Sequence, residues 1–120
     1  MLNLDTHMLI YALAGALRPR ERVLLSDAPW GIAAIVLWEL AKLSQLGRVS
    51  IDLQHPDVEA ALSAVHVWPL DLAVARTSTQ LDFRGDPADE LIAATSIVHR
   101  VPLLTRDRNM RRSKVVPLAK

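Results

Sequence analysis

Cysteine is missing from this 120-residue chain, so disulfide bonds, zinc–thiolate sites and thiol nucleophiles are all excluded. A long apolar run is missing as well, because no stretch reaches the roughly 18 residues that a membrane span needs. The apolar N-terminal stretch MLNLDTHMLIYALAGAL lacks the basic start of a signal peptide, and Asp5 and His7 interrupt it early. We therefore expect this stretch to be part of the fold, and the protein to be cytoplasmic with no membrane partner.

Repeats, low-complexity tracts and glycine- or serine-rich linkers are also absent, which leaves no candidate domain boundary. Hydrophobic residues make up 51% of the chain and charged residues 22%, a balance typical of a compact globular protein. A chain of this length can bury a real core without metal or disulfide staples. We expect a single domain over residues 1–120.

The net charge is only +1, but the basic residues are unevenly distributed. Half of them lie in the last stretch of the chain: Arg100, Arg106, Arg108, Arg111, Arg112, Lys114 and Lys120. Asp107 is the single acidic residue there. This stretch is either a solvated terminal face or a surface that contacts a phosphate backbone, and composition does not separate the two.

Short apolar runs alternate with longer segments of helical periodicity. The apolar runs predict five strands, at residues 2–4, 31–34, 65–68, 101–105 and 114–118. Helices are expected at residues 6–16, after Pro19, at 35–46 with Gly47 as the stop, and at 56–64, 70–81, 87–99 and 107–112. Strands that alternate with helices form parallel sheets with helices on both faces. The expected fold class is a three-layer α/β/α domain with a short, mostly parallel central sheet.

Four acidic side chains lie just after predicted strands or near the start of the helices that follow. Asp5 comes directly after the first strand, and Asp107 follows the PLLT strand. Asp89 lies in the first turn of its helix, and Glu39 lies one turn into the helix after the second strand. Functional sites of open α/β sheets lie outside the carboxyl ends of the strands. We expect these four carboxylates to face one edge of the sheet.

Each acid also has a purely structural explanation. Asp5 and Asp107 can be helix N-caps, because N-caps commonly occur in short loops after strands. In the stretch GDPADELIAATS, Asp86 before Pro87 and Asp89 three positions later can form a capping pair. Glu39 lies beside an apolar stripe, where its carboxylate can extend to solvent or pair with a lysine.

A joint explanation accounts for all four acids at once. Carboxylates gathered at one sheet edge repel and raise one another's pKa unless cations neutralise them. Mg²⁺ or Mn²⁺ suits such a set of oxygen ligands and retains several waters. Such a site activates water and stabilises the charge that develops on a phosphate during in-line displacement. The acids and the basic C-terminal stretch together predict a phosphodiesterase that acts on a polyanion.

With these residues identified, the chain resembles a PIN-domain ribonuclease of the VapC type, found in toxin–antitoxin systems. The resemblance covers nearly the whole chain and rests on four segments in order. These are LDTH with Asp5, LWELAKLSQLGR with Glu39, FRGDPADELIAATSIVHR with Asp89, and VPLLTRDRNM with Asp107. Each segment is weak evidence alone, but the four in order are specific.

The resemblance implies a PIN-like fold and Mg²⁺- or Mn²⁺-dependent endonucleolytic cleavage of RNA, with tRNA or rRNA as typical targets. It also implies a homodimer and a small cognate antitoxin whose tail fills the groove. The catalytic and metal-site residues that it implies are Asp5, Glu39, Asp89 and Asp107. Related toxins often have His at the position of Arg84 and Arg at the position of Glu90, so contacts with substrate or antitoxin can differ here.

Several further residues are candidates for auxiliary roles. Thr6 and Thr105 adjoin two of the acids and either orient a ligand or water, or are ordinary cap and strand-end hydroxyls. Asp86 is interpreted mainly as the cap of its helix. No histidine is expected to act as the general base. The candidate RNA contacts are Arg106, Arg108, Arg111 and Arg112.

Two alternatives to a nuclease stay open. A signalling module of the receiver type also gathers acids and Mg²⁺ at the carboxyl ends of parallel strands. It needs paired acids after the first strand and a phospho-acceptor Asp after a central one, whereas Asp5 stands alone and Asp71 has no matching partners. The second alternative is a PIN-like protein that has lost activity and only binds a partner.

Overall fold

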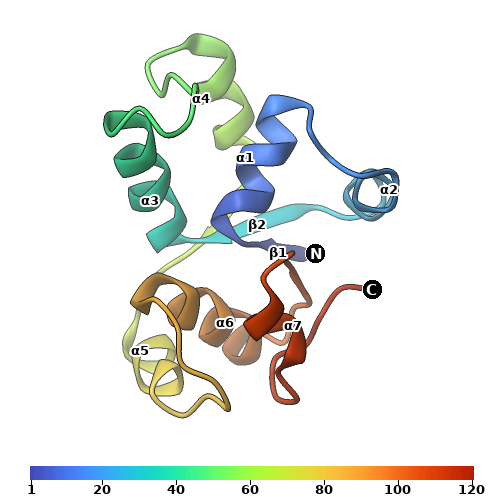
Figure 1. Ribbon diagram of the computed structural model, residues 1–120, viewed down its shortest axis with the longest axis vertical. Coiled ribbons are helices and arrows are strands. Elements are labelled where there is room, and N and C mark those ends of the chain that lie inside the picture. Colours follow the sequence, from blue (N-terminus) through green and yellow to red (C-terminus); the bar gives the residue numbers. More distant parts are fainter.

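A four-stranded parallel sheet crosses the middle of the protein, in the strand order β3–β2–β1–β4 (Figure 1). The computed structural model describes residues 1–120. The strands are short: β1 is Leu2–Leu4, β2 Trp30–Ala33, β3 His66–Trp68 and β4 Leu103–Leu104. In the centre of the sheet, Asn3 of β1 lies opposite Gly31 of β2 on one side and Leu103 of β4 on the other.

Seven helices surround the sheet. They are α1 Thr6–Ala14, α2 Pro19–Ser26, α3 Ala34–Gln45, α4 Pro56–Ser63, α5 Leu72–Ser78, α6 Pro87–His99 and α7 Arg108–Arg112. Figure 1 shows α1, α3 and α4 on one side of the sheet and α5, α6 and α7 on the other, with α2 beside the start of β2. The expected three-layer α/β/α architecture is therefore confirmed. None of these helices is long and apolar enough to cross a membrane.

Local chemistry explains where the helices begin and end. Helix α1 stops at Ala14 because Gly15 takes a left-handed conformation with φ of 70°, and its N–H donates to the carbonyl of Ala12. Gly47, with φ of 71°, lies just past the end of α3, as the sequence predicts. Helix α5 is shorter than expected and begins after Asp71, whose carboxylate accepts the Val74 N–H at 3.0 Å.

The strand expected at residues 114–118 does not form. Only Leu118 makes a parallel bridge, to Leu103 of β4. The Ser113 hydroxyl accepts the N–H groups of Val115 and Val116, and the carboxylate of Asp82 accepts that of Lys114. These donors are therefore unavailable for a strand ladder, and proline at position 117 has no N–H to offer.

The sheet and helices enclose one hydrophobic core. Its fully buried side chains include Leu4 of β1, Ile32 of β2 and Ile92 of α6. Asn3 is buried in the same layer, and its Nδ2 donates to the Ile92 carbonyl at 3.1 Å and to the Ser96 hydroxyl at 2.9 Å. These bonds attach the middle of β1 to α6, which fixes the start of α6 relative to the end of β1.

Gly31 provides a test of this packing. A Cβ at position 31 would overlap the Trp68 indole ring, which is buried and stacks on His99 with ring centroids 5.6 Å apart. We expect Gly31→Ala to lower the free energy of unfolding by about 1–3 kcal/mol, because overpacking displaces the ring.

Chemical denaturation measures this change. Gly85→Ala is the control, since its added Cβ would meet no atom closer than 3.8 Å. Equal stability of the two variants would show that the space beside Trp68 adjusts at no cost.

Candidate active site

A polar pocket of about 370 Å³ opens at the carboxyl edge of the sheet. Five acidic side chains line it, from the ends of β1 and β4 and from helices α3 and α6: Asp5, Glu39, Asp86, Asp89 and Asp107. We call it the acidic pocket. All four acids expected at this edge are therefore brought together from segments that are far apart in the sequence.

Asp5 serves as a helix cap and as a pocket residue at the same time. Its Oδ1 accepts the Met8 N–H at 2.9 Å at the start of α1, and its Oδ2 accepts a hydrogen bond from the Thr105 hydroxyl. The residue is 6% exposed. Burial raises the pKa of the Asp5 carboxyl, while the hydrogen bond from Thr105 lowers it. Asp5 therefore caps α1, as one explanation predicts, and lines the acidic pocket at the same time.

Asp107 is placed in the same manner. Its Oδ1 accepts the Met110 N–H at 3.0 Å and caps α7. Its own backbone N–H donates to the Thr105 hydroxyl oxygen at 3.0 Å. Thr105 thus connects the two acids, since its hydroxyl donates to Asp5 and accepts from the backbone of Asp107.

Glu39 is held at the edge of the pocket by Thr6, whose hydroxyl donates to its Oε1. The lysine explanation for Glu39 does not apply, because its carboxylate forms no ion pair with a lysine; its partly exposed side chain lines the acidic pocket. Since Thr6 follows Asp5 directly, the first turn of α1 positions both carboxylates.

The capping pair considered as an alternative for GDPADELIAATS is not formed. Asp86 occupies the N-cap position of α6, but its side chain accepts no hydrogen bond from the helix, and Pro87 at the next position starts the helix instead. The side chains of Asp86 and Asp89 line the acidic pocket. The prediction that Asp86 caps α6 through its side chain is therefore wrong.

The acids repel one another in this pocket. The pKa of Asp89 is raised to about 6, mainly because the group is partly buried and further because Asp107, Glu39, Asp86 and Asp5 lie nearby. Mg²⁺ and Mn²⁺ suit this pocket, because they prefer oxygen ligands and would neutralise the negative charge of the carboxylates. No three acidic or histidine side chains are preassembled around one ion position, so an ion here would retain part of its water shell, as Mg²⁺ does.

The predicted basic residues divide into two groups. Arg106 is engaged within the protein, since its Nε donates to Glu21 Oε2 at 2.8 Å and its guanidinium carbon lies 3.9 Å from the centre of the Tyr11 ring. Arg108, Arg111 and Arg112 are exposed on α7.

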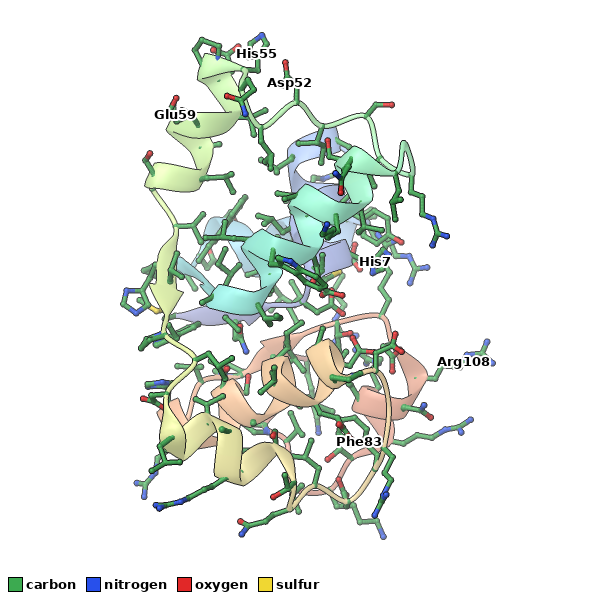
Figure 2. The ribbon with its side chains drawn as sticks, turned by 90° about the vertical axis from the view of Figure 1, so that its left-hand side faces the viewer. His7, Asp52, His55, Glu59, Phe83 and Arg108 are labelled. Atoms are coloured by element: carbon green, nitrogen blue, oxygen red, sulfur yellow. The ribbon has the colours of Figure 1, made fainter.

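Three further residues of this region are not predicted from the sequence. Tyr11 and His7 line the acidic pocket, and Glu21 is the ion-pair partner of Arg106. The signal for His7 is its position two residues after Asp5, which places it in the first turn of α1 (Figure 2). Nothing in the sequence links Glu21 to Arg106, because they meet only through the tertiary fold.

An α/β/α domain with carboxylates gathered at the carboxyl edge of a parallel sheet has the organisation of a nuclease of the PIN type. The chain belongs to the PIN-domain family, whose model matches residues 3–115. This family assignment replaces the receiver-type alternative.

Among curated proteins, the chain is 39% identical over 84 residues to Ribonuclease VapC22 of Mycobacterium tuberculosis. The match covers 67% of this chain and 64% of that protein, so it spans somewhat less than two thirds of the relative's length.

Two solved structures share the fold. A toxin–antitoxin complex from Klebsiella pneumoniae matches with a TM-score of 0.74 at 21% identity, covering 99% of this chain and 97% of the other. The VapBC2 complex of Rickettsia felis, bound to a promoter DNA fragment, matches with a TM-score of 0.73 at 19% identity, covering 99% and 98%.

Repulsion at Asp89 predicts a pH-dependent stability of the metal-free protein. Its pKa is raised from 3.8 to about 6 on folding, so the folded state holds the proton more tightly and the free energy of unfolding falls as pH rises between these values. Asp89→Asn removes this loss of stability, because asparagine carries no charge at any pH. We expect the variant to be more stable than the parent above pH 6, by on the order of 1 kcal/mol because solvent screens this partly exposed group, and equal to it below pH 4.

Urea denaturation in the presence of a chelator, at several pH values, measures the difference. Added Mg²⁺ should then stabilise the parent protein more than the variant, because binding to the folded state alone raises stability. A variant less stable than its parent at pH 8 would show that Asp89 supports the fold rather than opposing it.

Proposed function

We propose that this protein is a Mg²⁺- or Mn²⁺-dependent endoribonuclease and the toxin of a type II toxin–antitoxin pair. The observation that supports this most directly is the meeting of carboxylates from four separate segments in one pocket of a PIN domain. The residues proposed to hold the ion, directly or through water, are Asp5, Glu39, Asp89 and Asp107. RNA is proposed as the substrate because the curated relative is a ribonuclease.

The protein's part in the reaction is positioning. Thr105 holds one oxygen of Asp5 and also fixes the backbone of Asp107, while Thr6 holds one oxygen of Glu39. Each of these carboxylates keeps its remaining lone pairs for a ligand. Bound at this position, Mg²⁺ or Mn²⁺ supplies an activated water and stabilises the charge that develops on the phosphate.

The second open alternative, an inactive PIN-like binding protein, differs from this proposal in activity alone. We expect the protein to cleave total cellular RNA with Mg²⁺ or Mn²⁺ and not with a chelator. Asp5→Asn should lower the rate by on the order of a hundredfold or more, because the pocket loses a charge aimed at the reacting centre. The fold should persist, since an asparagine at position 5 can still accept the Met8 N–H.

A matched pair of glutamate variants completes this test. Glu39→Gln should lose activity to a similar extent, whereas Glu59→Gln should not. Glu59 is exposed on α4, far from His7 and Arg108 (Figure 2). Folded protein that cleaves no RNA with either metal would favour the inactive binding protein.

The partners proposed for the chain are a small cognate antitoxin and a second copy of itself. Support for the antitoxin comes from the fold, which the chain shares with structures described as toxin–antitoxin complexes. Expression in a bacterial host should stop growth, and Asp5→Asn should abolish this effect.

Co-expression of a short reading frame found next to the gene should restore growth to cells that carry the active protein. Growth arrest that persists with Asp5→Asn would separate toxicity from nuclease activity and contradict the assignment of the protein as a ribonuclease toxin.

A further inference from the structure

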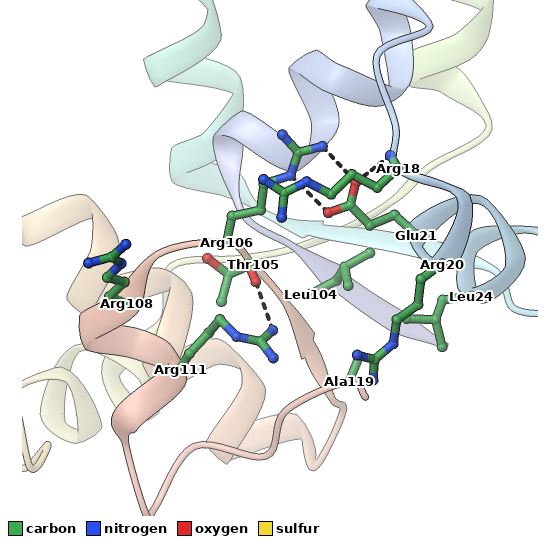
Figure 3. A pocket seen from close by; sticks show the side chains of 10 residues that line it. All are labelled: Arg18, Arg20, Glu21, Leu24, Leu104, Thr105, Arg106, Arg108, Arg111 and Ala119. Atoms are coloured by element: carbon green, nitrogen blue, oxygen red, sulfur yellow. Dashed lines mark hydrogen bonds and ion pairs between the residues drawn. The ribbon is translucent and has the colours of Figure 1, made fainter.

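A second pocket, of about 550 Å³, adjoins the acidic pocket and carries the opposite charge. Five arginines and a single acid, Glu21, line it; the arginines are Arg18, Arg20, Arg106, Arg108 and Arg111. We call it the arginine pocket. Figure 3 shows Arg18 and Arg20 on the α2 side and Arg108 and Arg111 on the α7 side, with Arg106 between them.

Glu21 does not neutralise the pocket as a whole, because its ion pair with Arg106 engages both of its carboxylate oxygens. The Arg106 Nε and one terminal nitrogen donate to the two carboxylate oxygens at 2.8 and 2.7 Å. These hydrogen bonds lower the pKa of Glu21, which stays ionised and paired. Four arginines remain without an acidic partner.

The unpaired arginines are available to a ligand. Arg18 and Arg20 form no ion pair within the chain. Arg111 donates one bond to the Thr105 carbonyl at 3.2 Å, which holds its guanidinium over the pocket and leaves its other donors free. Planar guanidinium groups arriving from two distant segments match the oxygens of a phosphate better than single ammonium groups do.

Arg106 lines both pockets, so they meet at this residue. A ligand that leaves the acidic pocket over Arg106 therefore enters the arginine pocket directly. A polyanion such as RNA fits two adjoining pockets, because one of its phosphates can lie in the acidic pocket while another lies in the arginine pocket. The acidic pocket repels phosphate until a cation is present, whereas the arginine pocket attracts it without one.

We propose that the arginine pocket binds a phosphate of the RNA strand outside the cleavage site, through Arg18 and Arg20 of the α2 side and Arg111 of α7. This proposal rests on the proposed ribonuclease function and adds α2 to the RNA-binding surface. In this proposal, Arg106 is held by Glu21 and lies between the two pockets, while Arg108 lies at the edge of the arginine pocket. The pocket recognises phosphate and reads no base.

The experiment measures binding of a labelled oligouridylate to the full chain that carries Asp5→Asn, so that cleavage does not interfere. Arg18→Ala together with Arg20→Ala should weaken binding roughly tenfold at low salt. It should also flatten the dependence of log Kd on log salt by about 0.7 for each phosphate that the variant no longer neutralises. Arg18→Lys with Arg20→Lys should retain most of the slope, because the charge is kept.

The matched control is Arg22→Ala with Arg48→Ala, which removes the same charge from exposed positions outside the pocket. An unchanged slope in the Arg18/Arg20 variant, or an equal change in the control, would overturn the proposal. Binding of an acidic peptide that is lost in the same variant, with RNA binding intact, would assign the pocket to a protein partner instead.

The outcomes for the pocket and for the nuclease are distinguishable. If the parent protein cleaves RNA and the Arg18/Arg20 variant keeps its affinity and salt slope, the arginine pocket proposal fails and the nuclease stands. If the parent cleaves no RNA with either metal but the variant loses oligouridylate binding, the nuclease proposal fails and the pocket remains an RNA site. Thermal melting of both double variants verifies that neither has unfolded.

Discussion

Electrostatic repulsion among carboxylates is the constraint around which this protein is organised. The chain places five acids at the carboxyl edge of a short parallel sheet, where burial and mutual charge raise the pKa of Asp89 to about 6. Such an arrangement lowers stability in the absence of a cation. It persists because the surrounding elements are attached independently: Asn3 joins β1 to α6, and the core packs beneath both.

Two of the acids offset this repulsion by stabilising helices. Asp5 and Asp107 each use one carboxylate oxygen to cap a helix. The hydrogen bonds that these oxygens accept from backbone N–H groups stabilise the carboxylates and oppose the repulsion. Thr105 joins the two, and Thr6 restrains Glu39. The side chain of Asp86 receives no such hydrogen bond from α6, and Asp89 keeps a raised pKa. Capping a helix and lining the acidic pocket are therefore combined in single residues.

The sequence was sufficient for what periodicity and spacing determine. It predicts the order of strands and helices, the span of α6 and the convergence of four acids, since parallel strands share one carboxyl edge. It fails where side chains compete for backbone groups. Ser113 and Asp82 take donors that a fifth strand needs, and Pro87 starts α6 without a bond from Asp86. The sequence also does not predict the ion pair between Glu21 and Arg106, because these residues are 85 positions apart.

The pairing of Arg106 with Glu21 keeps the two pockets electrostatically distinct. Arg106 lines the acidic pocket, where a free guanidinium would pair with one of the carboxylates and occupy the position of a cation. Glu21 binds it through both oxygens, and Tyr11 covers its face at 3.9 Å, so its charge is already compensated on the far side. The carboxylates of the acidic pocket thus form no ion pair with Arg106. Two surfaces of opposite sign can lie side by side because the residue between them is neutralised by an ion pair of its own.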